Sequence, residues 1–456
     1  MEQIRAIPGW ELLMTAARLA EESGWHLYLV GGIVRDLLLA QTTAASLASQ
    51  DIDLVVDGCS QIADVGAGVK LAIALRQVYP TAHLDIHQAF QTAALRLDLD
   101  HPFGALGVDI ATARTESYAY PAANPEVSVS SIRQDLYRRD FTINAMAWRL
   151  TSSPDAPLVD LYGGLIDLGA KKIRVLHPDS FIDDPTRIYR GARFAVRLGF
   201  EFETQTAAYI QTAISSGIYS QTAQAHHRTP ALQTRLRTEL KYLFQVSYWQ
   251  PTLELLAELG ALQCVHPTLK LDPGLLQQLR LLARCLGRFV PVAPLSENAG
   301  KIVQWRSQLE LTIASLAPVY RRSVAENLQL PPDSIQRLTD LDRVEAEVRS
   351  LLSTTEPVSQ VVRLLNQSSL EMLLLVGIRC QDSLPIRRQI WKYITVWQHI
   401  SPILNGDDLR RLGYKPGPQY RQILAALLVA TLDGKVVDRS TAEDFVASHS
   451  RIDRVD

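Results

Sequence analysis

The stretch "LYLVGGIVRDLLL" (residues 27–39) places two adjacent glycines between an apolar strand-like run and a short helical run. This strand–turn–helix pattern predicts the start of an α/β or α+β layer. The glycine pair has two interpretations: a phosphate-binding turn at a helix N-terminus, or a tight corner between two elements. Arg35 in the first helical turn either clamps a phosphate or pairs with Asp36. Only the rest of the chain can decide between these.

Length and composition restrict the class of protein. With 456 residues, two or more domains are expected. The formal net charge of −2 excludes a global basic field, so any nucleic-acid surface must be local. The four cysteines form no CxxC pair, which argues against a disulfide framework or a zinc site and predicts a cytoplasmic protein. We expect no membrane association, because no apolar run approaches the ~20 residues that span a bilayer.

The organisation changes along the chain. Up to about residue 150, helical runs alternate with short strand-like runs such as 51–56, 93–99 and 107–113, which predicts an α+β domain with a mixed sheet. From about residue 180 almost all periodicity is helical, which predicts an extended all-α region of several sub-bundles. The junction is expected within 153–164.

The strand-like run "DIDLVV" (51–56) carries two carboxylates. Side chains alternate along a strand, so Asp51 and Asp53 point to one face. Oxygen ligands of this kind suit Mg²⁺, which binds one or two carboxylates together with substrate phosphates. The alternative is a solvated strand end without a metal.

The segment "YRRDFTINAMAW" (137–148) has polar residues inside an apolar run. On a helix, Asp140 and Asn144 would face the same way and could bind a ribose hydroxyl, while Arg139 could meet a phosphate. Alternatively, Asp140 caps the segment that follows it.

The segment "DDPTRIYRGARFAVRLGF" (183–200) is the most informative. Arg187, Arg190, Arg193 and Arg197 fall on one face of a helix that is expected to start near Pro185. These cations would repel each other without an anionic partner, and no acid is interleaved among them. Asp184 with Arg187 could read the edge of a nucleobase. The alternative is a solvated basic face.

In this order the motifs resemble those of the class II tRNA nucleotidyltransferase and bacterial poly(A) polymerase family. The resemblance rests on "LVGGIVRDLLL…DIDLVV", "RRDFTINAMAW", "DLYGG" and "DDPTRIYRGARFAVRLGF", over residues 27 to 200. "TRLRTELKYLF" (234–244) resembles the next motif more loosely, because Thr234 stands where glutamate is usual. Asp183 likewise replaces the more frequent glutamate. The segment 405–424 resembles a common C-terminal segment of the family.

The resemblance implies a role for each matching position. Asp51 and Asp53 would hold two catalytic Mg²⁺ ions, and Gly32 and Arg35 would bind the triphosphate, leaving Gly31 as the corner. Asp184 and Arg187 would act as a protein template that pairs with incoming C or A. The remaining nucleotide-binding positions would be Arg139, Asp140, Asn144, Arg190 and Arg193. Asp160 would lie near the hinge between head and neck.

The resemblance also implies an architecture and an activity. We expect a polymerase-β-like nucleotidyltransferase head with a mixed sheet (1–155), a helical neck (156–245) and an elongated helical body and tail (246–456) that binds the acceptor stem and elbow of tRNA. The activity would be template-independent addition of C and/or A to tRNA 3′ ends from CTP and ATP, with release of pyrophosphate. CC-only addition, A-only addition, poly(A) synthesis and an inactive RNA-binding protein stay open as alternatives.

A loop, several basic clusters and a histidine pair allow further predictions. Any C-to-A switch would involve the loop within 113–136. Arg321–Arg322, Arg387–Arg388 and Arg410–Arg411 with Lys415 are candidate phosphate contacts or ordinary surface charge. We interpret His226–His227 as structural, expect no phosphohydrolase metal motif, and expect no obligate protein partner.

Overall fold

The computed structural model forms two compact units, Met1–Lys270 and Leu271–Asp456. The structure describes residues 7, 9–43, 51–58, 66–98, 100, 105–118, 120, 123, 125–151, 158–217, 230–289, 297–352 and 357–449. His226–His227 lie outside the described residues, as do parts of the 113–136 loop. The single division after Lys270 does not test the predicted boundaries at 155 and 245, which stay predictions.

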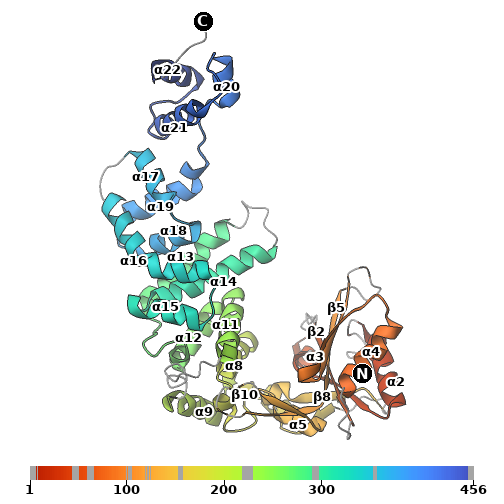
Figure 1. The fold of residues 1–456 in the computed structure, drawn as a ribbon. Helices are drawn as coiled ribbons and strands as arrows, with labels where there is room; N and C mark the ends of the chain where they lie inside the picture. The colour runs from red at the N-terminus through yellow and green to blue at the C-terminus, as the bar shows by residue number, and fades with distance from the viewer. Residues whose placement is uncertain are drawn as a thin grey trace. The chain divides into compact units, whose positions relative to one another are not determined.

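A seven-stranded mixed sheet organises the first unit (Figure 1). Its order is β3-β4-β5-β2-β1-β8-β9. The strands are β1 (His26–Val30), β2 (Asp51–Asp57), β3 (His83–His87), β4 (Thr92–Leu97), β5 (Leu106–Thr112), β8 (Met146–Arg149) and β9 (Leu158–Asp160). β2 and β5 pair in parallel, and the other described neighbours pair antiparallel. The predicted mixed sheet is therefore confirmed.

Two layers cover the sheet. α2 (Trp10–Glu22) and α4 (Ala67–Val78) pack on one face (Figure 1). On the other face, Tyr28, Val30 and Val55 form an apolar cluster with Leu136 of α5 (Ile132–Tyr137). Side chains alternate between the two faces of the sheet along β1 and β2. The face that buries Val30 and Val55 therefore also carries Asp53.

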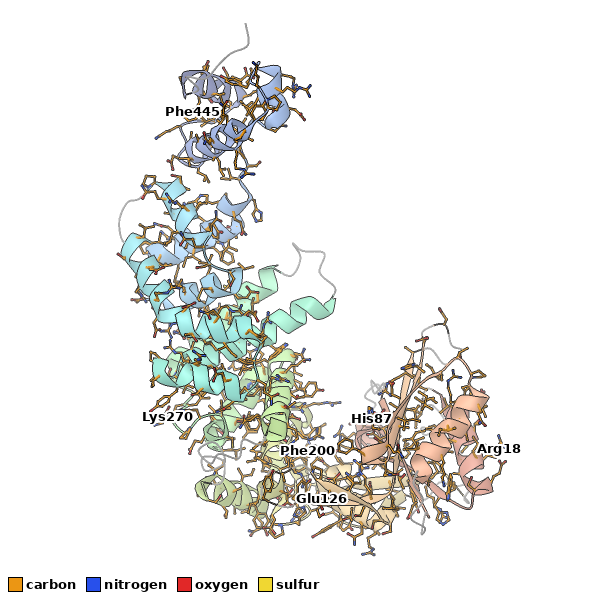
Figure 2. All side chains as sticks on the ribbon, viewed as in Figure 1. Arg18, His87, Glu126, Phe200, Lys270 and Phe445 are labelled. Atoms are coloured by element: carbon orange, nitrogen blue, oxygen red, sulfur yellow. The ribbon has the colours of Figure 1, made fainter. Side chains whose placement is uncertain are left out.

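The remaining elements of the first unit follow this layer. α3 (Gly32–Thr43) follows β1, and a two-stranded hairpin of β6 (Arg114–Ser117) and β7 (Glu126–Val129) precedes α5. Helices and short strands then complete the unit: η2 (Thr142–Asn144), α6 (Gly164–Gly169), β10 (Lys172–Ile173), α7 (Ser180–Asp183), α8 (Thr186–Leu198), β11 (Glu201–Phe202), α9 (Thr204–Ser215), α11 (Pro230–Gln245) and α12 (Trp249–Glu258). In Figure 2, Glu126 marks the hairpin and Phe200 marks the end of α8.

The second unit is helical, as the sequence predicted. Its helices are α13 (Pro273–Phe289), α14 (Glu297–Ala314), α15 (Pro318–Asn327), α16 (Pro332–Leu352), α17 (Val358–Leu365), α18 (Leu370–Arg379), α19 (Leu384–Thr395), α20 (Gly406–Arg411), α21 (Pro418–Leu432) and α22 (Arg439–His449). Within the described chain, no single helix is long and apolar enough to cross a membrane. The pair α17 and α18 meets that criterion together but is bent by 112°.

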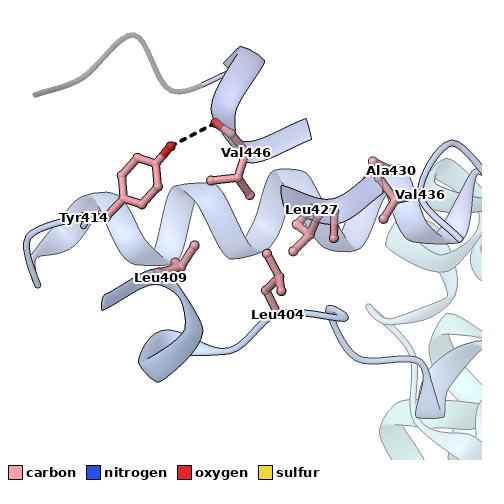
Figure 3. Close-up of a cluster of buried hydrophobic side chains, with 8 residues drawn as sticks. Leu404, Leu409, Tyr414, Leu427, Ala430, Val436 and Val446 are labelled. Atoms are coloured by element: carbon pink, nitrogen blue, oxygen red, sulfur yellow. Dashed lines mark hydrogen bonds between the residues drawn. The ribbon is translucent and has the colours of Figure 1, made fainter. Parts of the chain in front are cut away.

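The last three helices have a core of their own (Figure 3). Leu409 and Leu427 are fully buried there, and the Tyr414 hydroxyl donates to the carbonyl of Val446 at 3.4 Å. A capping box of Asn405 and Asp408 starts α20: the side chain of each residue accepts the backbone N–H of the other. The segment 405–424 therefore forms a capped helix, a turn and the start of a second helix.

Candidate active site

A cavity of about 780 Å³ lies within the first unit, a volume typical of small-ligand sites. Its lining comes from the sheet, from the segment after α5, and from α8 and α11. It includes every residue proposed above for nucleotide binding except Arg193. Residues more than 200 positions apart in the sequence, such as Val30 and Tyr242, thus meet around one cavity.

The Gly31–Gly32 turn forms one wall of this cavity. Gly31 has φ +79°, and α3 starts at the next residue. A Cβ on Gly31 would lie 3.1 Å from Asp53 Oδ2 and 3.2 Å from Arg139 Nη1. Both the positive φ and this close approach require glycine. The family resemblance implies a ligand-binding role only for Gly32, whereas both glycines line the cavity.

Two carboxylates sit side by side on parallel strands in the lining. Asp53 on β2 is in register with Asp109 on β5, and Asp109 also pairs with Arg96 at 2.9 Å. Sequence reasoning missed Asp109; a carboxylate inside the strand-like run "GVDIATA" was the available signal. The side chain of Asp51 lies outside the described residues, while its backbone pairs with Gly107.

The fit to a divalent cation follows from this donor set. The described residues contain no group of three or more His, Cys, Asp or Glu arranged to hold a metal. Asp53 and Asp109 nevertheless offer only carboxylate oxygens on one edge of the cavity, and oxygen donors with substrate phosphates are what Mg²⁺ prefers. Asp53 and Asp109 are therefore compatible with Mg²⁺.

A hydrogen-bonded chain links the head to α8. Arg35, only 2% exposed, donates from Nε to Asp36 (2.8 Å) and from Nη1 to Asn144 Oδ1 (2.7 Å). Asn144 Nδ2 donates to Asp140 Oδ1 (3.1 Å), whose Oδ2 accepts from Arg190 Nε (2.8 Å). Asp140 and Asn144 meet as predicted, but in a short 3₁₀ turn rather than an α-helix. Arg35 therefore pairs with Asp36 and also lines the cavity, while its role as a phosphate clamp stays a prediction.

The charge on Asp140 is stabilised within the cavity wall. Burial acts to raise its pKa, but the Arg190 charge and hydrogen bonds from Asn144 and Arg190 outweigh it, so the pKa lies below the usual value. Asp140 Oδ1 also accepts the N–H of Phe141 at 2.9 Å, which is a local capping contact. Asp140 is thus an anchored carboxylate that presents a fixed negative edge.

Arg139 has spare hydrogen-bonding capacity. Its Nη2 donates to Asp135 Oδ2 at 3.1 Å. Its Nε is buried and has no hydrogen-bond partner among the described residues. An unpaired buried donor is costly, so an acceptor on a bound ligand would relieve that cost.

The arginine stripe on α8 forms as predicted, but its partners differ from expectation. Carboxylates from other elements neutralise it: Arg190 meets Asp140, and Arg193 meets Glu239 at 2.6 Å. Arg197 lies 3.5 Å from Asp36. The anionic partners that this stripe requires are therefore carboxylates of the same chain that lie far from it in the sequence. Arg193 also packs on the Tyr242 ring at 5.3 Å.

The proposed template pair lies at the start of α8. Asp184 Oδ1 accepts from the backbone N (3.0 Å) and hydroxyl (2.6 Å) of Thr186, so it caps the helix. Arg187 is 7% exposed and is bound elsewhere, to Ser180 and to the carbonyl of Arg138. Asp184 and Arg187 both line the cavity and present separate polar groups to it.

Helix α11 contributes residues that sequence reasoning left without a role. Its cavity-facing residues are Thr234, Arg235, Thr238, Glu239 and Tyr242. The i, i+4 spacing of 234, 238 and 242 was the available signal. Arg235 Nε lies 3.7 Å from Asp184 Oδ2, so α11 reaches the proposed template pair.

Several other sequence candidates have structural partners. Asp160 accepts the N–H groups of Gly164 (2.8 Å) and Leu165 (2.9 Å) and so caps α6. Arg321 is 4% exposed and binds Asp342 at 2.7 Å, which makes it a core residue of the helical unit. Arg322 pairs with Glu326 on the surface.

Comparisons with known proteins agree with this geometry. Two family models match: the poly(A) polymerase head domain over residues 27–174, and the probable RNA and SrmB-binding site of polymerase A over residues 230–272. An A-adding tRNA nucleotidyltransferase of Geobacter sulfurreducens is 30% identical over 439 residues, which are 95% of this chain and 46% of that protein. The chain therefore spans less than half of that relative's length.

Two further proteins match over most of their length. An A-adding tRNA nucleotidyltransferase of Halalkalibacterium halodurans is 29% identical over 452 residues, covering 95% of this chain and 91% of that protein. A solved structure of a CCA-adding enzyme in an apo form has a TM-score of 0.75 at 28% identity and covers 98% of each chain. The similarity to these proteins thus extends over both the sheet-containing unit and the helical unit.

Proposed function

Because the chain belongs to the class II tRNA nucleotidyltransferase family, we propose that it adds C and/or A to the 3′ end of tRNA from CTP and ATP, releasing pyrophosphate. The observation that carries the proposal is the single cavity that gathers the Gly31–Gly32 turn, Asp53, Arg139 and the Asp184–Arg187 pair. Such a reaction needs residues that hold a metal, residues that bind the phosphates and residues that read the base.

Different residues of the chain bind the triphosphate, the ribose and the base. The Gly31–Gly32 backbone and Arg139 bind the triphosphate, since Arg139 Nε is buried and needs an acceptor. Asp140 and Asn144 orient the ribose. Asp184 and Arg187 read the base edge by hydrogen bonds. Arg190 and Arg193 support this wall from α8, Arg193 through Glu239 and Tyr242.

Asp51 and Asp53 would hold Mg²⁺, with Asp109 beside them. When bound, the metal would stabilise the attacking 3′-hydroxyl oxygen and the departing pyrophosphate. The carboxylates position the 3′-hydroxyl against the α-phosphate, and the arginine wall holds the triphosphate in line. We also place the reaction in the cytoplasm and the tRNA on the helical region, where Arg410, Arg411 and Lys415 are candidate phosphate contacts.

The nucleotide specificity has two candidates. Addition of A to tRNAs that end in CC is the first, because two relatives that match 95% of the chain are A-adding enzymes. Full CCA addition is the second, because the similar solved structure is a CCA-adding enzyme.

One experiment separates these activities. Transcripts of tRNA ending before CCA, after C and after CC are incubated with labelled CTP or ATP and Mg²⁺. A single A added only to the CC end supports the first candidate, and a complete CCA end supports the second. Products that stop at CC, or a long A tail, indicate the other family activities. No product with any substrate refutes the proposal and favours an RNA-binding protein.

A further inference from the structure

Two fixed acceptors determine the orientation of the Arg187 guanidinium. Its Nη1 donates to the hydroxyl of Ser180 at 2.7 Å, and its Nη2 donates to the backbone carbonyl of Arg138 at 3.0 Å. Ser180 is fully buried at the start of α7, so water does not compete for its hydroxyl. Because the two bonds come from different nitrogens, they fix the plane of the group. A guanidinium has five N–H donors, so donors remain for a ligand.

The second acceptor is itself held in place. Arg138 donates from Nη2 (2.7 Å) and Nε (3.1 Å) to Asp135 Oδ1, and Asp135 is fully buried. Arg138 Nη1 donates to Glu116 Oε1 at 2.7 Å. Two carboxylates therefore hold the side chain of Arg138, the residue whose backbone carbonyl accepts from Arg187.

Glu116 connects this arrangement to the β6–β7 hairpin. It lies on β6, and its Oε2 accepts from the hydroxyl of Tyr118 at 3.1 Å. Glu116 and Tyr118 both line the cavity. A displacement of the hairpin would therefore disturb the side-chain contacts of Arg138, the residue whose carbonyl Arg187 uses.

We propose that Ser180 and Glu116 are positioning residues that set the orientation of Arg187 from two sides and thereby determine which nucleobase the cavity accepts. The inference rests on the proposed function, since it assumes that Arg187 reads a base. Base reading by paired hydrogen bonds depends on direction, so a guanidinium free to rotate would accept the wrong donor and acceptor pattern more often. A purely structural role for Ser180 would stabilise the fold without affecting the choice of nucleotide.

The test compares nucleotide discrimination in matched variants. Ser180→Ala removes the hydroxyl, and Glu116→Gln removes the carboxylate charge while keeping an acceptor. Ser334→Ala is the control, because Ser334 is also fully buried and donates a side-chain bond, to Glu310, in the other unit. For each variant, kcat/KM is measured for CTP, ATP, GTP and UTP on the tRNA that the wild type extends, together with the thermal midpoint.

A good bidentate contact contributes about 5- to 150-fold in discrimination, so we expect Ser180→Ala to lose roughly tenfold. The loss should appear mainly as a higher KM for the correct nucleotide, with kcat changed by less than about threefold. Glu116→Gln should lose less discrimination than Ser180→Ala, and Ser334→Ala should lose none. Discrimination within twofold of wild type in both Ser180→Ala and Glu116→Gln overturns the inference, whatever the thermal midpoints. If Ser180→Ala does not fold, Glu116→Gln decides: a threefold loss supports the inference and wild-type discrimination overturns it.

Failure of the proposed function would look different. If the wild type extends no tRNA, equilibrium binding of the four nucleotides to the wild type, Ser180→Ala and Glu116→Gln replaces kinetics. Selective binding that Ser180→Ala and Glu116→Gln both weaken then supports the positioning role without the transfer activity. Unselective binding, or no binding, refutes the positioning role as well.

Discussion

Replacing Gly31 with alanine separates a phosphate-binding turn from a simple corner. Gly31 has φ +79°, so any L-residue there carries a backbone strain of about 1–2 kcal/mol. The added Cβ would also lie 3.1 Å from Asp53 Oδ2 and 3.2 Å from Arg139 Nη1. Those distances are tighter than ordinary contacts, so one of the two charged groups has to shift by a few tenths of an ångström.

The chain offers a matched control in Gly24, in the turn between α2 and β1. Gly24 has φ +73°, and a Cβ there would meet nothing within 4 Å. Gly24→Ala therefore carries the same strain without a contact in the cavity. We expect both variants to lose about 1–2 kcal/mol of stability. Only Gly31→Ala should lose incorporation, by roughly 10- to 100-fold, since small misplacements at a reacting centre have effects of this order.

The assay is single-turnover incorporation at saturating nucleotide and tRNA, with thermal unfolding measured on the same preparations. Saturation excludes a simple loss of affinity, and the unfolding midpoints show whether the strain is equal in the two variants. Incorporation by Gly31→Ala that equals incorporation by Gly24→Ala would refute the reasoning, because Gly31 would then serve only as a corner.

Three further predictions test the site. Asp53→Asn should reduce incorporation about a thousandfold or more while tRNA binding persists, because metal-assisted charge stabilisation contributes several kcal/mol; equal incorporation would exclude the metal role. Glu239→Gln should lower the urea unfolding free energy by about 1–3 kcal/mol, since it removes the charge that holds Arg193, whereas Glu326→Gln in an exposed pair should cost less than about 0.5 kcal/mol. The lowered pKa of Asp140 means that its stabilisation is present above the unfolded pKa of about 3.9 and is lost as pH falls through the lower folded pKa. Asp140→Asn should therefore differ most from wild type in urea midpoint near pH 6, and least below that folded pKa.

Local patterns in the sequence predicted the parts of the site, because each part is encoded within about twenty residues. The Gly–Gly turn, the strand with Asp53 and the α8 stripe depend on glycine conformation and on periods of 2 and 3.6 residues. The segment 141–148 was the exception. It forms a 3₁₀ turn and strand β8 rather than a helix, because β8 pairs with β1, more than a hundred positions earlier. Short apolar runs fit either structure until a partner strand decides.

The partners of the arginines could not be predicted in this way. Asp36 and Glu239 lie 161 and 46 positions from the arginines that they meet, so no spacing rule connects them. The stripe therefore looked unneutralised in the sequence although the fold neutralises it. Asp109 escaped notice for the same reason, since its role depends on register with Asp53 in a parallel pair that only the sheet topology establishes.

The charge balance of the cavity bears on the proposed Mg²⁺. Six arginines and six carboxylates line it among the described residues, so the formal balance is zero. The carboxylates are Asp53, Asp109, Glu116, Asp140, Asp184 and Glu239. A nucleoside triphosphate brings several negative charges into this balanced space, where a low dielectric makes uncompensated charge expensive. The arginines cannot neutralise the ligand fully while they hold their own carboxylates. A divalent cation that enters with the triphosphate and binds at Asp53 would offset two of these negative charges, so we expect the cavity to bind a metal-bound nucleotide more tightly than a free one.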